Sequence, residues 1–182
     1  MDLLNKIYAH TPFGNKQIAL TIELTTRCNM SCQICSHPLL KNKLISKNIL
    51  LKVFRRIVDE FSDILKKRDK PLLNPVGLGE PLHYPNLAGA LNYWRKTTGG
   101  IITLNTNGML LDQNASKLIL NYMNREGDIF IISLNASNAE AYRIFTEVDL
   151  YLNVVENIKQ FSQFRGDLNY PRVLILFLEY KK

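Results

Sequence analysis

The sequence predicts an α/β protein built on a parallel sheet, and three observations support this class. Five hydrophobic runs of strand length occur along the chain, and each is nearly continuous, as expected for strands covered on both faces. The segments between them repeat apolar residues with a period near 3.6, which is typical of helices. The chain has 182 residues, whereas a closed (β/α)8 barrel takes roughly 250. The pattern therefore fits either an open or partial (β/α) barrel or a doubly wound sheet.

The strands are expected over residues 17–24, 72–78, 101–107, 128–135 and 172–180. Alternation of these strands with helices implies a parallel sheet with right-handed crossovers. In both candidate architectures the active residues gather at the carboxyl ends of the strands. The residues that follow each hydrophobic run are therefore the first candidates for a functional site.

Helices are expected between the strands, each from an apolar stripe at helical spacing. Ser46 is the predicted N-cap of the first helix, whose stripe runs from Leu50 to Leu65. Asn86 is expected to start the second helix, and Gly99-Gly100 to end it. The remaining helical segments are expected between residues 112 and 127, over residues 139–145 and from about 149 to 165.

Composition and length indicate one ordinary globular domain, with a lead-in over residues 1–16 and a core over residues 17–182. No secretory signal is recognisable at the start, and no apolar stretch reaches the roughly 18 residues that a membrane span needs. We therefore expect a cytoplasmic protein without a membrane partner. Thiols stay reduced in that compartment, so clustered cysteines favour metal ligation over disulfides.

The formal net charge is +7, and much of the basic excess lies in residues 41–70, with ten Lys and Arg against four acidic residues. A basic face of this kind can attract nucleic acid or an acidic peptide. A solvated outer helix face explains the same pattern more simply. We favour that interpretation because the chain contains no nucleic-acid recognition motif.

All three cysteines of the chain, Cys28, Cys32 and Cys35, follow the first predicted strand with the spacing C-x3-C-x2-C. One interpretation is a structural zinc site that uses His37 as a fourth ligand, although zinc sites usually combine two well-separated ligand pairs. The other is a [4Fe–4S] cluster, which normally takes four cysteines, so that three would leave one iron open. An open coordination position marks a catalytic metal centre.

The stretch "CNMSCQIC" after a strand resembles the cysteine loop of the radical S-adenosylmethionine (radical SAM) superfamily. The resemblance implies a partial (β/α) barrel of five to six parallel strands with outer helices. It implies that S-adenosyl-L-methionine (SAM) chelates the open iron and that one electron from the cluster cleaves SAM to a 5′-deoxyadenosyl radical. That radical would remove hydrogen from a substrate, which the sequence leaves open among peptide, RNA and small molecule. An external electron donor such as flavodoxin or ferredoxin is implied as well.

Further residues match the superfamily at the ends of the first three strands. Ile34 stands where an aromatic residue near the adenine is frequent. The segment "GLGEP" resembles a Gly-Gly-Glu-Pro motif, which implies that Gly79 and Glu80 bind the SAM amino group. Asn107, in "NTNG", lies where the superfamily has a similar turn near SAM. Taken alone, each of these segments also reads as a plain turn or loop.

The fourth predicted strand ends in "SLNASNAEAYRIF". The resemblance implies that Ser133 and Arg143 contact the SAM carboxylate, a role that suits the planar fork of arginine. Asn135 occupies a place often held by an aspartate that contacts the ribose. A surface cation on a helix is the simpler interpretation of Arg143.

A sixth strand is not visible in the sequence. We therefore expect either a truncated core or an unusually small member, with a partner subunit or second copy covering the open sheet edge if the core is truncated. Two other hypotheses stay open. One is a zinc-stabilised α/β binding module held by Cys28, Cys32, Cys35 and His37. The other is a noncatalytic relative that serves as a subunit.

Overall fold

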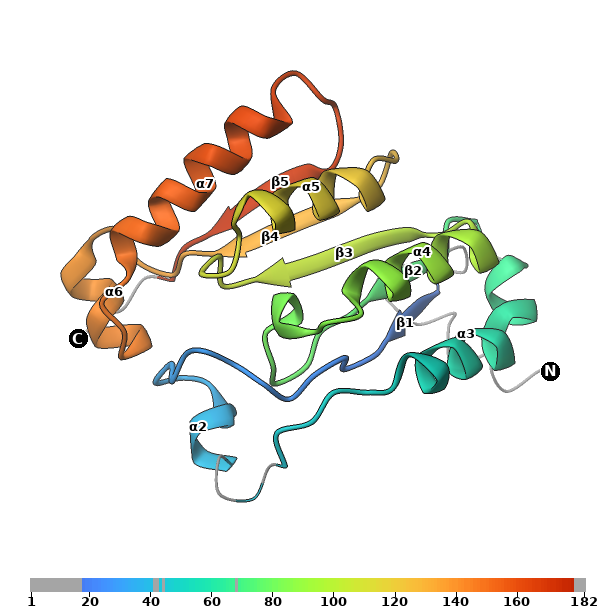
Figure 1. Cartoon of the computed structure of the whole chain (residues 1–182), viewed down its shortest axis with the longest axis horizontal. Coiled ribbons are helices and arrows are strands. Elements are labelled where there is room, and N and C mark those ends of the chain that lie inside the picture. The colour runs from blue at the N-terminus through green and yellow to red at the C-terminus, as the bar shows by residue number, and fades with distance from the viewer. Residues whose placement is uncertain (1–17, 41–42, 44, 68, 179–182) are drawn as a thin grey trace.

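The computed structural model describes residues 18–40, 43, 45–67 and 69–178 (Figure 1). The described residues form one five-stranded sheet in which the strands lie side by side in chain order, each parallel to its neighbours. A doubly wound sheet would reverse its strand order at a switch point, and this sheet does not. The partial (β/α) barrel is therefore confirmed. Its strands are β1 (Ala19–Thr21), β2 (Leu72–Asn74), β3 (Ile101–Thr106), β4 (Ile129–Ser133) and β5 (Arg172–Leu176).

Four long helices form one layer on the outer face of the sheet, because neighbouring helices of this layer contact one another in chain order (Figure 1). They are α3 (Leu51–Lys66), α4 (Leu87–Thr98), α5 (Gln113–Tyr122) and α7 (Tyr151–Arg165). The predicted short segment forms α6 (Ala139–Thr146). Two short helices were not predicted, because neither is long enough to show an apolar stripe: α2 (Ser36–Leu40) and the 3-10 helix η2 (Pro81–His83).

Two predicted helix boundaries are wrong. Helix α3 begins after Leu50 without a side-chain cap, so Ser46 is not its N-cap. The segment before α3 instead runs extended beside the cysteine loop, where Thr25 and Asn48 form an antiparallel bridge. Helix α5 ends with Met123 at its C-cap, before the predicted limit at Gly127. These boundaries follow from tertiary contacts that local sequence does not encode.

Other predicted boundaries are confirmed. Asn86 precedes α4, and Gly99 ends it in a left-handed conformation at φ 68°, which glycine adopts at little cost. The Asp112 side chain accepts a hydrogen bond from the Ala115 amide at the start of α5. The strands are shorter than predicted; β2 stops before Pro75, which has no N–H to donate to a ladder. Residue 17 and residues 179–180 of the predicted strands lie outside the described residues.

The two faces of the sheet differ in burial, which corrects the expectation that both are fully covered. Ile102, Leu104, Phe130 and Ile132 are completely buried against the outer helices. The alternate residues of β3 and β4 face the inner side and are mostly only half-buried. Five strands do not close a barrel, so the inner side remains a trough that can hold other groups.

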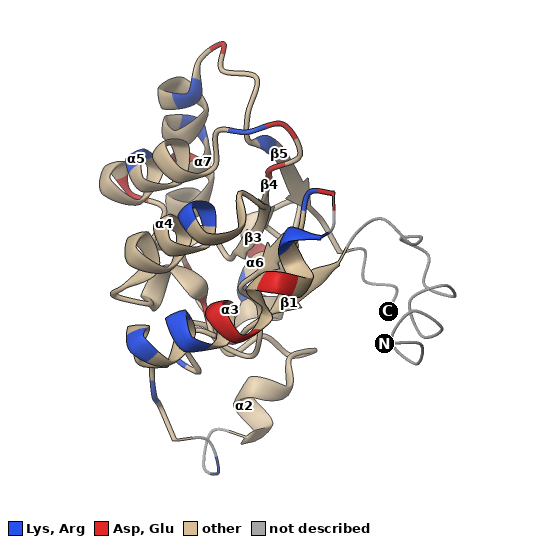
Figure 2. Ribbon diagram, turned by 90° about the vertical axis from the view of Figure 1, so that its right-hand side faces the viewer, with Lys and Arg blue, Asp and Glu red and all other residues tan. Residues whose placement is uncertain are grey.

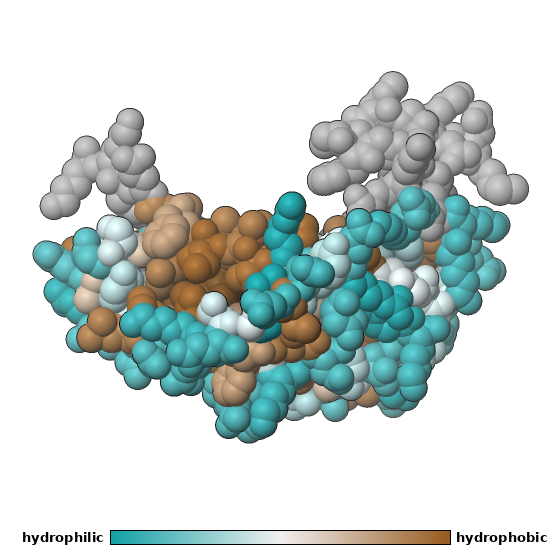
Figure 3. Space-filling view, turned by 90° about the horizontal axis from the view of Figure 1, so that it is seen from above, coloured by the Kyte–Doolittle hydropathy of each residue, from teal (hydrophilic) through white to brown (hydrophobic). Residues whose placement is uncertain are grey.

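Strand β5 forms one edge of the described sheet, and its surroundings are strongly apolar. Figure 3, which looks onto the molecule from the side of β5 and α7, shows an apolar area at this edge. Five consecutive residues are between 39% and 57% exposed: Leu174, Ile175, Leu176, Phe177 and Leu178. Exposed apolar edge strands invite pairing with further chain.

The predicted basic segment is partly described. Figure 2 shows both basic and acidic side chains on α3, where Arg56 forms an exposed ion pair with Glu60 at 2.8 Å. Arg55 stacks over the ring of Tyr93 at 5.2 Å. These contacts fit a solvated helix face. None of the helices in the described ranges combines the length and apolar character needed to span a bilayer.

A buried ion pair joins the layers at the amino edge of the sheet. Arg95 of α4 contacts Asp128, which directly precedes β4, and the two side chains are 8% and 0% exposed. The guanidinium also donates to the carbonyls of Gly100 and Tyr122. The carboxylate accepts from the amide of Ile102 at 2.9 Å. This network fixes the start of β3 and β4 against α4 and α5.

Replacing Asp128 by Ala leaves the guanidinium of Arg95 buried without its partner, so we expect the free energy of unfolding to fall by about 3–5 kcal/mol. The exposed pair provides a control, because Arg56→Ala should cost less than about 1 kcal/mol. Urea denaturation of both variants measures the difference. Equal losses in the two variants would contradict the stabilising role of the buried network.

Candidate functional site

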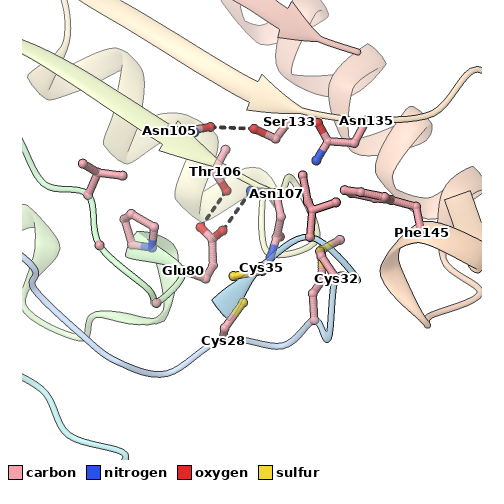
Figure 4. A pocket seen from close by; sticks show the side chains of 16 residues that line it. Cys28, Cys32, Cys35, Glu80, Asn105, Thr106, Asn107, Ser133, Asn135 and Phe145 are labelled. Carbon is pink, nitrogen blue, oxygen red and sulfur yellow. Dashed lines mark hydrogen bonds between the residues drawn. The ribbon is translucent and has the colours of Figure 1, made fainter. Parts of the chain in front are cut away.

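The cysteine loop lies at the carboxyl edge of the sheet, directly after β1. Its three free thiols are half-buried and line one cavity of about 330 Å³ (Figure 4). The same cavity is lined by residues that follow β2, β3 and β4, which are far apart in the sequence. Parallel strands explain this convergence, since all their carboxyl ends lie at one edge.

Three backbone hydrogen bonds hold the cysteine loop from two sides. The amide of Glu80, after β2, donates to the Arg27 carbonyl at 2.7 Å. On the opposite side, the amide of Gln33 donates to the Phe145 carbonyl at 2.9 Å at the end of α6. The amide of Ser31 donates to the next carbonyl of α6 at 3.3 Å. The loop is thus clamped between β2 and α6.

Side chains fasten the same loop at two further points. The Asn107 amide nitrogen donates to the Asn29 side-chain oxygen at 2.7 Å, linking the loop to the end of β3. The Thr25 hydroxyl donates to the Asn48 side chain at 2.7 Å. The Thr26 hydroxyl donates to a carbonyl of the segment before α3, that of Ile45, at 2.9 Å. The position of the thiols is therefore set by four separate parts of the chain.

Gly79 is required where the loop after β2 meets the cysteine loop. A methyl group at this position would lie 2.0 Å from the carbonyl oxygen of Thr25 and 2.9 Å from that of Arg27. Both are backbone atoms, which cannot move aside without displacing the loop. The structure thus gives Gly79 a packing role against the chain itself, in addition to its place in the lining of the cavity.

Glu80 is 4% exposed and accepts three hydrogen bonds within the chain. One carboxylate oxygen accepts from the Thr106 hydroxyl at 2.7 Å and the Leu82 amide at 3.1 Å. The other accepts from the Asn107 amide at 2.8 Å (Figure 4). Burial raises the pKa of Glu80 above its usual value, while these donors oppose the shift. A carboxylate offers about four acceptor sites, so one remains for a donor in the cavity.

The end of β4 contributes Ser133 and Asn135 to the lining. The Ser133 hydroxyl donates to the Asn105 side chain at 2.9 Å (Figure 4). Asn135 has φ 59°, a left-handed conformation in which Asn is enriched among non-glycine residues. Its amide donates to the Leu176 carbonyl at 2.9 Å, which connects the site to β5.

Most of the predicted site residues are brought together, and two are not. Ile34 and Asn107 line the cavity with the cysteines, although Ile34 is 62% exposed. Arg143 is exposed on α6 and is not part of the lining. His37 also stays outside the lining, and its Nε2 lies 2.9 Å from the Thr26 carbonyl. Within the described residues, no three His, Cys, Asp or Glu side chains are arranged to hold a metal ion.

Several lining residues were missed. Asn105 lies two positions before Asn107 and therefore shares its face of β3, a relation that strand alternation could have revealed. Thr106 enters the site only through its bond to Glu80, and Met30 through the fold of the loop. Phe145 comes from α6, and no local signal marks it as a site residue.

The surroundings of the thiols disfavour their ionisation in the absence of a ligand. Burial, together with the charges of the two other cysteines, raises the pKa of the Cys32 thiol to about 11. Burial also raises the pKa of Cys28, with the nearby Glu80 carboxylate adding to the effect. A bound cation that replaces the protons would remove this penalty, as thiolate ligation of metals does.

Comparison with known proteins agrees with this geometry. The chain is 32% identical over 146 residues to the GTP 3′,8-cyclase of Desulforamulus reducens, covering 78% of this chain and 41% of that protein. It is 25% identical over 150 residues to an uncharacterized protein of Methanocaldococcus jannaschii, covering 82% of this chain and 46% of that protein. The chain thus spans less than half the length of these curated relatives. No family model matches the sequence.

Solved structures share the fold. The anaerobic sulfatase-maturating enzyme anSMEcpe with bound AdoMet superposes with a TM-score of 0.67 at 18% identity, covering 87% of this chain and 43% of that chain. BtrN in complex with AdoMet and 2-DOIA gives a TM-score of 0.63 at 15% identity, covering 87% of this chain and 56% of that chain.

A parallel half-barrel with three cysteines in the loop after its first strand defines the core of a radical SAM protein. This chain belongs to the radical SAM superfamily.

We expect Gly79→Ala to displace the cysteine loop, since the new methyl group collides with backbone that cannot yield. Overpacking of this kind costs about 1–3 kcal/mol, and alkylation of the three thiols should become faster. Gly89→Ala is the control, because that position lies inside α4 and meets only the Leu51 side chain at 3.1 Å. Urea denaturation and mass spectrometry of alkylated cysteines give the two readouts. Unchanged alkylation in Gly79→Ala would show that this contact does not set the loop.

Proposed function

We propose that this chain is the catalytic core of a cytoplasmic radical SAM enzyme. Cys28, Cys32 and Cys35 would hold a [4Fe–4S] cluster, and SAM would occupy the adjoining part of the cavity. When bound, these cofactors supply a 5′-deoxyadenosyl radical that removes hydrogen from a substrate. The observation that carries the proposal is that three thiols line one cavity while His37 stays outside it.

The donor set fits a cluster better than a single ion. The thiols form no compact group with a fourth His, Cys, Asp or Glu among the described residues, as a structural zinc site would require. Each cysteine of a cluster binds a different iron, so thiolates that converge on a cavity without touching one another suit it. A cavity of about 330 Å³ lies within the usual range for small-ligand sites of roughly 300–1,000 Å³.

The remaining lining residues would position SAM. Glu80 has one acceptor site left for the ammonium group, and Gly79 keeps the loop after β2 low enough for that approach. Asn107, Ser133 and Asn135 present amide and hydroxyl groups on the same side of the cavity (Figure 4). We assign them to the polar groups of SAM.

The hydrophobic part of the wall would exclude water and contact the adenine. Met30, Ile34, Val76 and Phe145 supply this part. Arg143 could reach a SAM carboxylate only if its exposed side chain turned toward the cavity. We therefore assign it the weakest role among the predicted contacts.

Substrate and partners follow less directly. The name of one relative specifies GTP for that protein, and for this chain we propose a peptide, RNA or small-molecule substrate. An electron donor such as flavodoxin or ferredoxin would reduce the cluster. We further propose that additional polypeptide, from a longer chain or a partner subunit, covers the apolar edge of β5.

Anaerobic reconstitution with iron and sulfide should give a brown protein with about four irons per chain. Addition of SAM and dithionite should then release 5′-deoxyadenosine, measured by chromatography and mass spectrometry. Cys35→Ala should lose both the iron and the product, because one corner of the cluster lacks its ligand.

His37→Ala is the matched control for this experiment and should keep the full iron content. Loss of metal in His37→Ala, with zinc in the untreated protein, would instead establish the zinc-stabilised binding module. A protein that holds the cluster but never releases 5′-deoxyadenosine would be a noncatalytic relative.

The 182-residue chain should self-associate through the β5 edge, and Ile175→Lys should weaken this association by placing a charge among apolar neighbours. Gel filtration with light scattering measures the molar mass of both proteins. A compact monomer that cleaves SAM would show that the edge needs no cover.

A further inference from the structure

Tyr142 carries a polar group that the fold leaves without a partner. The side chain is completely buried in α6, and its hydroxyl has no hydrogen-bond partner among the described residues. Unpaired buried hydroxyls destabilise a protein and are rare in native structures, so each calls for an explanation such as an ion or ligand that completes the bond.

The surroundings of this hydroxyl point to the cysteine loop. Tyr142 belongs to a small buried cluster with Met30 and Val154, against which Cys28 and Cys32 are packed. Burial and then the charge of Cys32 raise the pKa of Tyr142, so the phenol stays protonated and remains a donor. The apolar members of this cluster offer no acceptor to that proton, which leaves the sulfur side as the nearest chemistry able to receive it.

The attachment of α6 to the loop keeps this relation fixed. The carbonyls of Phe145 and Thr146 accept hydrogen bonds from the amides of Gln33 and Ser31, which flank Cys32 in the sequence. Tyr142 lies one helical turn before these carbonyls. The helix that anchors the loop therefore also carries the unpaired hydroxyl.

We propose that Tyr142 is a positioning residue that donates its hydroxyl hydrogen bond to the sulfur of Cys32, or to an adjoining sulfide, once a cluster is bound. A neutral thiol is a weak acceptor, whereas a metal-bound thiolate is a strong one. Hydrogen bonds to the sulfurs withdraw negative charge and favour the reduced cluster, which raises its reduction potential. The inference rests on the proposed function, since it requires the cluster.

Tyr142→Phe removes only the hydroxyl. In the metal-free protein this group is unpaired, so the variant should melt at the same or a higher temperature. In the cluster-loaded protein its reduction equilibrium should shift about tenfold toward the oxidised form, equivalent to about 59 mV to lower potential for one electron. Calorimetry measures the first effect, and a redox titration followed by electron paramagnetic resonance measures the second.

Tyr151→Phe is the matched control. Its ring packs against Tyr142 at 5.7 Å, but its hydroxyl donates to the Ser137 carbonyl on the surface. This variant should leave the potential unchanged. Wild-type protein that assembles no cluster would defeat the proposed function itself.

Three results would overturn the inference while the proposed function stands. The first is an equal potential in cluster-loaded wild type and Tyr142→Phe. The second is destabilisation of the metal-free variant, which would mean that the hydroxyl already has a partner. The third is a folded variant that cannot hold the cluster, since the hydroxyl would then be needed for assembly rather than for potential.

Discussion

The contact between the loop after β2 and the cysteine loop is the constraint on which the site depends. The two backbones approach so closely at Gly79 that a single methyl group would collide with the Thr25 carbonyl. The hydrogen bond from the Glu80 amide to the Arg27 carbonyl closes the same junction. Because Glu80 is also bonded to the end of β3, one junction sets the relative positions of three strand ends. The thiols inherit their place from it.

Buried charge is used differently at the two edges of the sheet. At the amino edge, Arg95 and Asp128 neutralise each other and are surrounded by backbone partners, so the network is closed. At the carboxyl edge, Glu80 is buried with hydrogen bonds but without a cation. Uncompensated buried carboxylates are costly unless a ligand or partner meets them. The imbalance marks the carboxyl edge as the functional one on physical grounds.

Sequence reasoning predicted the parallel sheet because the strand runs and helix stripes are local patterns, and Asn86, Gly99 and Asp112 mark real helix ends. It failed at Ser46, where an extended segment pairs with the cysteine loop through long-range contacts. In the site, motif residues next to strand ends were found. Phe145 and Tyr142 were not, because only the docking of α6 on the loop brings them there. Likewise, exposure of Arg143 depends on the rotation of α6, which the sequence does not specify.

The shape of the sheet also separates what this chain supplies from what remains to be added. The fully buried residues of β3 and β4 face the outer helices, while the inner residues are only half-covered and β5 exposes apolar side chains. A radical that abstracts hydrogen has to be shielded from water and side reactions, and an open trough does not provide that. The cofactor side of the reaction can therefore reside in these residues. Closure of the inner face has to come from substrate or from further polypeptide, in keeping with relatives more than twice as long as the stretch they share with this chain.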